Sequence, residues 1–289
     1  MSKSAPVFST GQWLSDDGLT LRYREYPGPA DRPPVLCIPG LTRNCRDFEP
    51  VAEALGGQWR VICADLRGRG ASDYARDSSS YQPLQYASDI LALLDHLGLQ
   101  RSVALGTSLG GIVIMLLAMQ APERLAAVAL NDIGPDVESV GLARIRGYVG
   151  QGRSFATWMH AARGLREQVG AAHPDFEISD WLRFAKRLMA VGPGGRIAFD
   201  YDMKIAEPFQ TVGGTAPVDM WPAFRALAGR PLLALRGELS DILSPATLAR
   251  MKREVPELAT VTVGGVGHTP TLEEPAAQSA IKQLLAKLA

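Results

Sequence analysis

The sequence predicts an α/β protein whose mostly parallel sheet is covered by helices on both faces. Two observations carry this prediction. Strand-like and helix-like segments alternate along most of the chain, and most strand-like segments are continuous apolar runs. Such runs are typical of strands that are buried on both faces of a parallel sheet. A long segment without any such run, at 134–229, indicates an insertion into this arrangement.

Seven segments have the composition of strands. Residues 19–26 alternate apolar and polar side chains, which predicts a half-exposed strand. The six apolar runs lie at 34–38, 60–65, 102–106, 125–131, 230–237 and 258–265. Apolar residues at helical spacing, or prolines near an end, predict helices at 47–55, 83–99, 109–122, 245–254 and 275–288.

The insertion at 134–229 is predicted to form a helical cap over one end of the sheet, and 1–133 and 230–289 are predicted to form the core domain. Its large side chains stand among arginines, glycines and prolines, and include Phe184, Met189 and Phe199. Four cap residues are candidates for a substrate pocket, namely Trp158, Met159, Trp181 and Tyr201. More than half of the cap's aromatic and methionine side chains are nevertheless expected to form the cap's own core.

Composition limits the classes of partner. The 289 residues include 30 basic and 30 acidic residues, so the formal net charge is zero, and no basic stripe is present. A nucleic-acid partner is therefore not expected. The longest apolar run, 112–119, is too short to cross a bilayer, and no membrane partner is expected. A small-molecule substrate is expected instead. A homo-oligomer is compatible with the sequence, which does not determine the oligomeric state.

The N-terminus and the cysteines bear on the cellular compartment. The first ten residues lack a long apolar stretch, so a secretory signal is not expected. The three cysteines, Cys37, Cys45 and Cys63, form no C-x-x-C pair, and two of them lie in predicted strands. We interpret them as reduced core thiols of a cytoplasmic protein.

The stretch G-T-S-L-G, at 106–110, places Ser108 between a predicted strand and a predicted helix. A tight strand-to-helix turn with glycines two residues before and after the serine exposes its hydroxyl at the carboxyl end of the sheet. The helix N-terminus favours negative charge there, and the backbone N–H of Leu109 can bind a developing oxyanion. Ser108 is therefore the candidate nucleophile. The simpler interpretation, that Ser108 only caps the helix, stays open at this point.

A serine nucleophile needs a base and an orienting acid. Of the four histidines, His268 stands in a glycine-rich loop after the last predicted strand, at the same sheet edge as Ser108. It is the candidate base. The acid is expected after another strand, where Asp241 is preferred because it leads into the helix at 245–254, and Asp132 is the alternative acid.

A second oxyanion donor is expected from the loop after the strand at 34–38. Pro39 and Gly40 end this strand, and the backbone N–H of Leu41 could face that of Leu109 across the site. Gly40 leaves room for the approach. An ordinary proline-glycine turn would have the same sequence.

Five stretches, taken together in their order along the chain, resemble the α/β-hydrolase superfamily over nearly the whole chain. They are "CIPGLTRN", "DLRGRGASD", "GTSLGG", "RGELSDILSP" and "GVGHTPTLEEP". The resemblance is to the capped branch with a serine nucleophile, which includes esterases, lactonases and carbon–carbon hydrolases. It implies an eight-stranded sheet, a helical cap after the sixth strand, and a triad of Ser108, His268 and Asp241 in the chain order Ser, Asp, His.

Two positions depart from other branches of this superfamily. Pro39 stands where many members have histidine, and the hydrogen bonds that such a histidine makes in the oxyanion loop cannot come from Pro39. Ser108 stands where the branches that open epoxides or remove halogens have aspartate, so these two activities are not expected.

The expected activity is hydrolysis of a small, largely apolar carboxylic ester or lactone through an acyl-enzyme, with no metal or organic cofactor. Two alternatives stay open. The same triad could cleave a carbon–carbon bond of a diketone or open an enol-lactone, and the fold could serve as a receptor or sensor for a small ligand. Four residues could bind a polar or carboxylate end of the substrate, namely Arg43, Asn44, Arg144 and Arg146.

Overall fold

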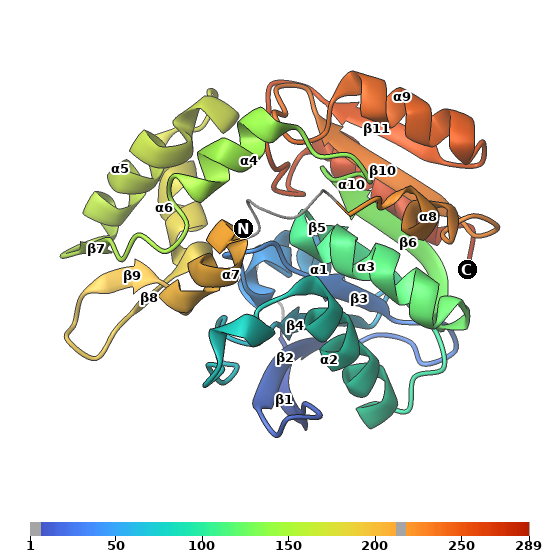
Figure 1. Cartoon of the computed structure of the whole chain (residues 1–289), viewed down its shortest axis with the longest axis horizontal. Coiled ribbons are helices and arrows are strands. Elements are labelled where there is room, and N and C mark those ends of the chain that lie inside the picture. Colours follow the sequence, from blue (N-terminus) through green and yellow to red (C-terminus); the bar gives the residue numbers. More distant parts are fainter. Residues whose placement is uncertain (1–6, 212–217, 289) are drawn as a thin grey trace.

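The computed structural model describes residues 7–211 and 218–288 and is built around an eight-stranded sheet (Figure 1). The strand order is β1-β2-β4-β3-β5-β6-β10-β11. In chain order these strands are β1 Ser9–Leu14, β2 Thr20–Tyr26, β3 Val35–Ile38, β4 Val61–Asp65, β5 Ser102–Thr107, β6 Leu125–Asn131, β10 Leu232–Gly237 and β11 Ala259–Val263. Only β1 with β2 and β2 with β4 pair antiparallel among these strands. The predicted mostly parallel sheet is confirmed.

The seven predicted strands are all present, and β1 is the strand that the sequence did not indicate. Trp13 is the only fully buried residue of β1, which lies at the edge of the sheet and pairs with β2 alone. An edge strand that is mostly exposed needs no apolar run, so the sequence "STGQWL" gave no signal for it.

Helices cover both faces of the sheet because neighbouring side chains of each strand point to opposite faces. Leu36 and Ile38 of β3 belong to the hydrophobic cluster on the face covered by α2 (Pro83–His96), α3 (Leu109–Gln120), α8 (Trp221–Arg225) and α9 (Pro245–Glu254). Val35 and Cys37 of the same strand belong to the cluster on the face covered by α1 (Glu49–Leu55) and α10 (Pro275–Leu285). The predicted helices are therefore present, and each ends within a few residues of the predicted bound.

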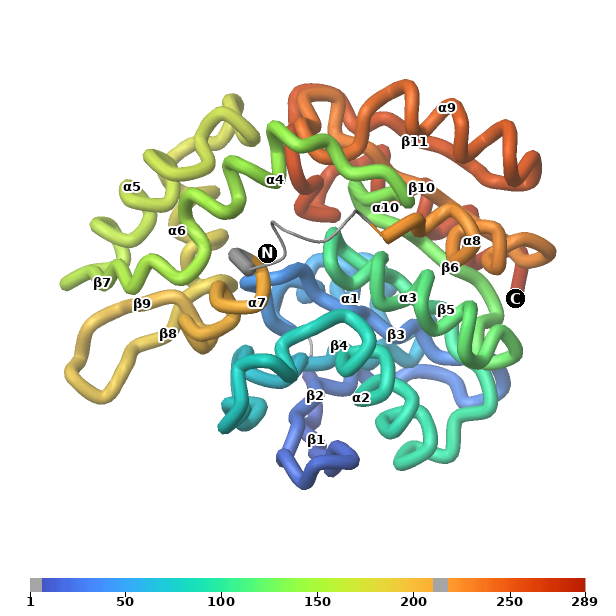
Figure 2. Tube along the Cα trace, viewed as in Figure 1, coloured from blue at the N-terminus to red at the C-terminus, as the bar shows by residue number. Residues whose placement is uncertain are grey.

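The chain leaves the core after β6, forms the cap, and returns at α8 (Figure 2). The cap contains α4 (Ser139–Arg146), α5 (Trp158–Val169), α6 (Ile178–Leu188) and α7 (Ala206–Thr211). It also contains a small antiparallel sheet, formed by β7 (Ser154–Phe155), β9 (Ile197–Phe199) and β8 (Met189–Val191). A purely helical insertion was expected, and these strands were missed because two or three residues are too few to show a strand pattern.

The end of the cap differs from the expectation in one respect. Helix α8 falls inside the range 134–229, yet Trp221 and Phe224 pack into the core cluster beside α3. The division of the chain at 133/134 and 229/230 stays a prediction.

The cap has a hydrophobic core of its own, as expected. Trp181, Phe184 and Met189 are buried in it, and Trp158 and Phe199 pack against it. Ion pairs join the cap to the core on this side, among them Arg46 with Asp200 at 2.7 Å, and Arg187 with Glu273. The cap is thus a packed layer held against the core.

The three cysteines are buried and free, as the sequence indicated. Within residues 7–211 and 218–288, the structure has no helix that is both long enough and apolar enough to span a bilayer.

Candidate active site

Four loops meet at the carboxyl edge of the sheet because β5, β6, β10 and β11 are neighbours in it. Ser108 follows β5, Asp132 follows β6, Ser240 lies in the loop after β10, and His268 lies in the loop after β11. The backbone N–H of Ser108 donates to the carbonyl of Asn131 at 3.0 Å, and that of Asp132 donates to Leu235 at 2.9 Å. The ends of β5, β6 and β10 are therefore hydrogen-bonded together.

Ser108 sits on a tight turn between β5 and α3. Its backbone has φ 51° and ψ −114°, a conformation that is strained for a residue with a side chain. A Cβ on Gly106 would stand 2.4 Å from the backbone of Gly110, and a Cβ on Gly110 would stand 2.0 Å from the carbonyl oxygen of Ile38. Glycine is therefore needed on both sides of the serine, as the motif indicated.

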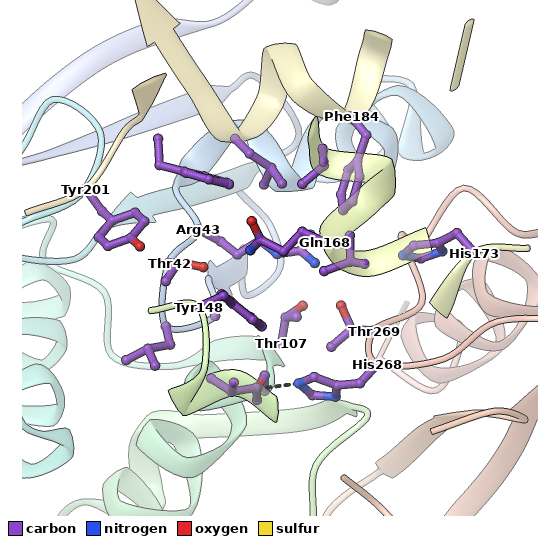
Figure 3. A pocket seen from close by; sticks show the side chains of 18 residues that line it. Thr42, Arg43, Thr107, Tyr148, Gln168, His173, Phe184, Tyr201, His268 and Thr269 are labelled. Atoms are coloured by element: carbon purple, nitrogen blue, oxygen red, sulfur yellow. Dashed lines mark hydrogen bonds between the residues drawn. The ribbon is translucent and has the colours of Figure 1, made fainter. Parts of the chain in front are cut away.

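His268 joins the serine to a carboxylate. Its Nε2 lies 2.9 Å from Ser108 Oγ (Figure 3), and its Nδ1 lies 2.7 Å from an oxygen of Asp132. Asp132 is fully buried and the His268 side chain is 6% exposed. The structure thus brings together Ser108 and His268 as predicted, and it makes Asp132 the carboxylate partner.

The choice of Asp241 as the acid is wrong in this structure, and the alternative, Asp132, holds that position. Asp241 instead forms a two-pronged ion pair with Arg144 of α4, at 2.6 and 2.8 Å. The Arg144 guanidinium holds the pKa of Asp241 below its ordinary value. Asp241 lies beyond the turn that ends β10, and its carboxylate pairs with the cap.

Asp132 reaches His268 because its own surroundings hold it. It directly follows β6 with a left-handed φ of 56°. One carboxylate oxygen accepts the N–H of Gly237 at 2.8 Å, and the other accepts the hydroxyl of Ser240 at 2.7 Å. Ser240 was missed because a serine in a polar loop has no distinguishing pattern in the sequence.

The oxyanion loop also has the predicted position. The point where a Cβ on Gly40 would stand is 3.7 Å from Ser108 Cβ, so this loop borders the serine. Leu41 lines the cavity in front of Ser108, and Leu109 begins α3, where the first N–H groups have no partner within the helix. The assignment of these two N–H groups as oxyanion donors stays a prediction.

Arg69 supports the oxyanion loop, a role that no pattern in the sequence indicates. Its side chain is fully buried, and its Nε donates to the carbonyl of Leu41 at 2.9 Å. Its Nη1 donates to the Arg67 carbonyl and to the hydroxyl of Tyr86. A buried arginine therefore fixes the loop at which Pro39 replaces the histidine of many relatives.

A small cavity of about 60 Å³ lies between this site and the cap, with room for a few water molecules (Figure 3). Core residues that line it include Leu41, Arg43, Ser108, His268 and Thr269. Cap residues that line it include Tyr148, Gln168, His173, Phe184 and Tyr201. The cavity is therefore closed by the core on one side and by the cap on the other.

Of the four predicted pocket residues, only Tyr201 lines this cavity. Trp181 is buried in the cap's own core, and Trp158 packs against that core. Met159 is 38% exposed to solvent. The assignments of Trp158, Met159 and Trp181 to this cavity are therefore wrong. Helix α5 contacts the cavity through Leu165, Gln168 and Val169, near the end of the helix, whereas Trp158 and Met159 lie at its beginning.

The four residues that could bind a polar group have different surroundings. Arg43 lines the cavity, while Arg144 is paired with Asp241. Asn44 is fully buried and accepts the N–H of Arg46 at the start of a short helix. Arg146 lies over the ring of Phe209, 5.5 Å from its centre. Only Arg43 of these four borders Ser108.

Burial shifts the pKa values of three side chains that line the cavity. Burial and the nearby charges of Arg43 and Arg187 lower the pKa of His173 to about 3, so this imidazole is neutral near pH 7. Burial raises the pKa values of Tyr148 and Tyr201, so both phenols keep their protons. The cavity is polar but contains few charges.

Comparison with known proteins finds hydrolases of the same fold. A family model described as the alpha/beta hydrolase fold matches residues 33–152. The 3-hydroxybutyrate-oligomer hydrolase of Cupriavidus necator is 32% identical over 281 residues, which cover 94% of this chain and 95% of that protein. The 2-(acetamidomethylene)succinate hydrolase of Mesorhizobium japonicum is 28% identical over 251 residues, which cover 86% of this chain and 85% of that protein.

A solved structure is similar over almost the whole chain. The crystal structure of an alpha/beta hydrolase from Novosphingobium aromaticivorans has a TM-score of 0.94 and 58% sequence identity, and the match covers 99% of this chain and 100% of that chain. With the sheet order, the strained serine and the similarity to named hydrolases, the chain therefore belongs to the α/β-hydrolase family.

Proposed function

We propose that this protein is a serine hydrolase that cleaves a small carboxylic ester or lactone through an acyl-enzyme. Ser108 is the nucleophile, His268 the general base and Asp132 the acid that orients it. One observation supports this most: the continuous chain of contacts from Ser108 Oγ to His268, at 2.9 Å, and from His268 to Asp132, at 2.7 Å. These distances are within the range over which a base can take the proton of a nucleophile.

Acylation then follows from the geometry. His268 Nε2 takes the hydroxyl proton of Ser108 while Ser108 Oγ attacks the carbonyl carbon, and the carbonyl oxygen becomes an oxyanion. The N–H groups of Leu41 and Leu109 donate to that oxyanion, and one such donor contributes roughly 3–4 kcal/mol to the transition state. When the tetrahedral intermediate collapses, the carbon–oxygen bond to the alcohol breaks and His268 gives the proton to the leaving oxygen.

Deacylation repeats these steps with water as the nucleophile. His268 takes a proton from water, the hydroxide attacks the acyl carbon, and Ser108 leaves with the proton returned by His268. Asp132 keeps the imidazole in one orientation and stabilises it while it is protonated. Ser108, His268, Asp132 and the two N–H groups supply every group that this reaction needs, so no cofactor is proposed.

The nature of the cavity supports a compact substrate. It has a volume of about 60 Å³ and combines aliphatic and aromatic side chains with polar ones. The 32% identical relative is named a 3-hydroxybutyrate-oligomer hydrolase, and hydroxy-acid units are joined through ester bonds. This favours an ester over a diketone as the substrate. The buried, free cysteines fit a reducing compartment such as the cytoplasm.

The test compares the wild type with Ser108→Ala on 4-nitrophenyl acetate and butyrate. The proposal predicts release of nitrophenol by the wild type and loss of at least about a thousandfold in kcat in the variant. Wild-type rates in a pure preparation of the variant would show that Ser108 is not the nucleophile. A folded wild type that turns over neither ester would contradict the proposed ester substrates and favour a lactone, a diketone or a receptor role.

A further inference from the structure

The cavity beside Ser108 has a polar end that the proposed reaction does not use. Arg43 is the only charged residue at neutral pH among the described residues that line the cavity, apart from any charge on the reacting His268. The lining contains no aspartate or glutamate among those residues. A cavity with a guanidinium and no carboxylate favours an anionic group in the ligand over a cationic one.

Arg43 is held close to the reacting serine by its own turn. The N–H of Arg43 donates to the carbonyl of Gly40 at 3.2 Å, so the turn that presents Leu41 to the oxyanion also carries Arg43. Arg43 Cγ and Ser108 Cβ both lie within 4 Å of the point where a Cβ on Gly40 would stand. The first carbon atoms of the Arg43 side chain therefore lie close to Ser108.

The Arg43 guanidinium is held in place by protein contacts that do not use all of its N–H donors. Its Nη1 donates to Asp47 at 2.9 Å, and the group lies over the ring of Phe184, 4.8 Å from its centre. An arginine has five N–H donors, and the contact with Asp47 uses one of them. These two contacts hold the guanidinium in one place and leave N–H donors along the edge of its plane, the geometry that suits a carboxylate.

Two buried polar groups that line the same cavity point to a ligand independently. Thr269 and His173 are each only 2% exposed. Among the residues that the structure describes, neither Thr269 Oγ1 nor His173 Nδ1 has a hydrogen-bond partner in the protein. Both side chains line the cavity and face its interior together with Gln168 (Figure 3). A buried polar atom without a partner is costly, and an oxygen-bearing ligand would supply the missing hydrogen bonds.

We propose that this end of the cavity is a subsite for a carboxylate carried by the substrate, with Arg43 as its main ligand and Gln168, His173 and Thr269 as neutral hydrogen-bonding neighbours. The substrate class is then the half-ester of a short dicarboxylic acid, or an ester that ends in a hydroxy acid. This specificity rests on the proposed ester hydrolysis, but the subsite itself can be tested without turnover.

The experiment uses the Ser108→Ala protein, which cannot consume an ester by the proposed route. Calorimetric titration compares monomethyl glutarate, which has a free carboxylate, with dimethyl glutarate, which is neutral and of similar length. The anionic ester should bind roughly ten- to a hundredfold more tightly, the range expected for hydrogen bonds to a charged group. Equal affinity of the two esters would overturn the proposal.

Two further variants identify the residue responsible. Arg43→Gln, added to Ser108→Ala, should abolish the preference for the anionic ester. Arg24→Gln is the matched control, because Arg24 also has one carboxylate partner, Glu49 at 2.6 Å, and also lies over a ring, that of Phe8 at 4.2 Å, but does not line the cavity. It should keep the preference. A preference that survives Arg43→Gln would mean that the carboxylate binds elsewhere.

This test separates the subsite from the reaction. Selective binding of the anionic ester without any ester turnover by the wild type would support the subsite and contradict the proposed hydrolysis. Turnover of neutral esters by the wild type, without tighter binding of the anionic ester, would support the proposed hydrolysis and contradict the subsite. If Arg43→Gln fails to fold, because Asp47 is buried beside it, Arg43→Lys keeps the charge without the planar group and should retain only part of the preference.

Discussion

Asp132, and not Asp241, is the carboxylate hydrogen-bonded to His268, at 2.7 Å. In the proposed triad the acid therefore comes from the end of β6, one strand nearer to the serine than the loop after β10. Its oxygen that contacts His268 also accepts the hydroxyl of Ser240, so the loop after β10 contributes a positioning group rather than the acid. This arrangement leaves Asp241 free to bind Arg144 of the cap.

Asparagine at the two positions should have very different effects on turnover. We expect Asp132→Asn to lower kcat for 4-nitrophenyl butyrate by about a thousandfold or more, because the amide no longer holds the imidazole in the productive tautomer or stabilises its charge. Asp241→Asn should change kcat by less than about fivefold, since its partner is an arginine on a partly exposed surface. A larger loss in Asp241→Asn would contradict the assignment.

Ser240→Ala tests the positioning of Asp132. Without the hydroxyl, one oxygen of a fully buried carboxylate loses a donor, and we expect kcat to fall about tenfold with little change in KM. Ser240→Thr keeps the hydroxyl and should restore most of the rate. A serine that only stabilises the fold would change the melting temperature without this selective and rescuable loss of kcat.

Arg69→Met tests the support of the oxyanion loop. Methionine keeps the buried chain but removes the N–H that donates to the Leu41 carbonyl at 2.9 Å. We expect kcat to fall about tenfold or more, because a shifted loop aligns the Leu41 N–H less well with the oxyanion. Steady-state kinetics at a temperature well below the melting point of the variant provides the measurement. A kcat equal to that of the wild type would show that the loop does not depend on Arg69.

His173 should make the fold sensitive to acid. Its pKa is lowered to about 3 in the folded protein, against an ordinary value near 6.5. Below pH 6.5 the unfolded chain binds a proton at this residue and the folded chain does not, so stability is lost as the pH falls from about 6.5 towards 3. At pH 5 this loss is about 2 kcal/mol.

The measurement is the free energy of unfolding by urea at pH 7.5 and pH 5. His173→Phe cannot titrate at this position, and it should lose about 2 kcal/mol less than the wild type between these two pH values. Equal losses in the two proteins would mean that His173 is as easily protonated in the folded state as in the unfolded chain.

Much of the core could be predicted from the sequence because its signals are local. Apolar runs gave the buried strands, and the glycines around Ser108 gave the strained turn, since both depend on neighbouring residues. His268 was found because a loop after a parallel strand must lie at the carboxyl edge of the sheet. The edge strand β1 and the short strands of the cap lack such local patterns.

The acid and the cavity could not be predicted in the same way because they depend on side-chain direction. Asp132 and Asp241 both follow strands at the correct edge, and only the hydrogen bonds of Gly237 and Ser240 decide between them. Trp181 was expected to line the pocket because it is a large aromatic residue of the cap, yet the orientation of α6 buries its side chain in the cap's own core. Sequence gives the edge of the sheet on which a residue lies, but not the direction of its side chain.

The central claim is that Ser108 forms a covalent acyl-enzyme, and intact-mass measurement with a fluorophosphonate tests it most directly. The wild type should gain the mass of a single phosphonyl group, which peptide mapping should locate at Ser108, and Ser108→Ala should gain none. Asp132→Asn should label far more slowly than Asp241→Asn. An unlabelled but folded wild type, or an adduct on another residue, would contradict the account.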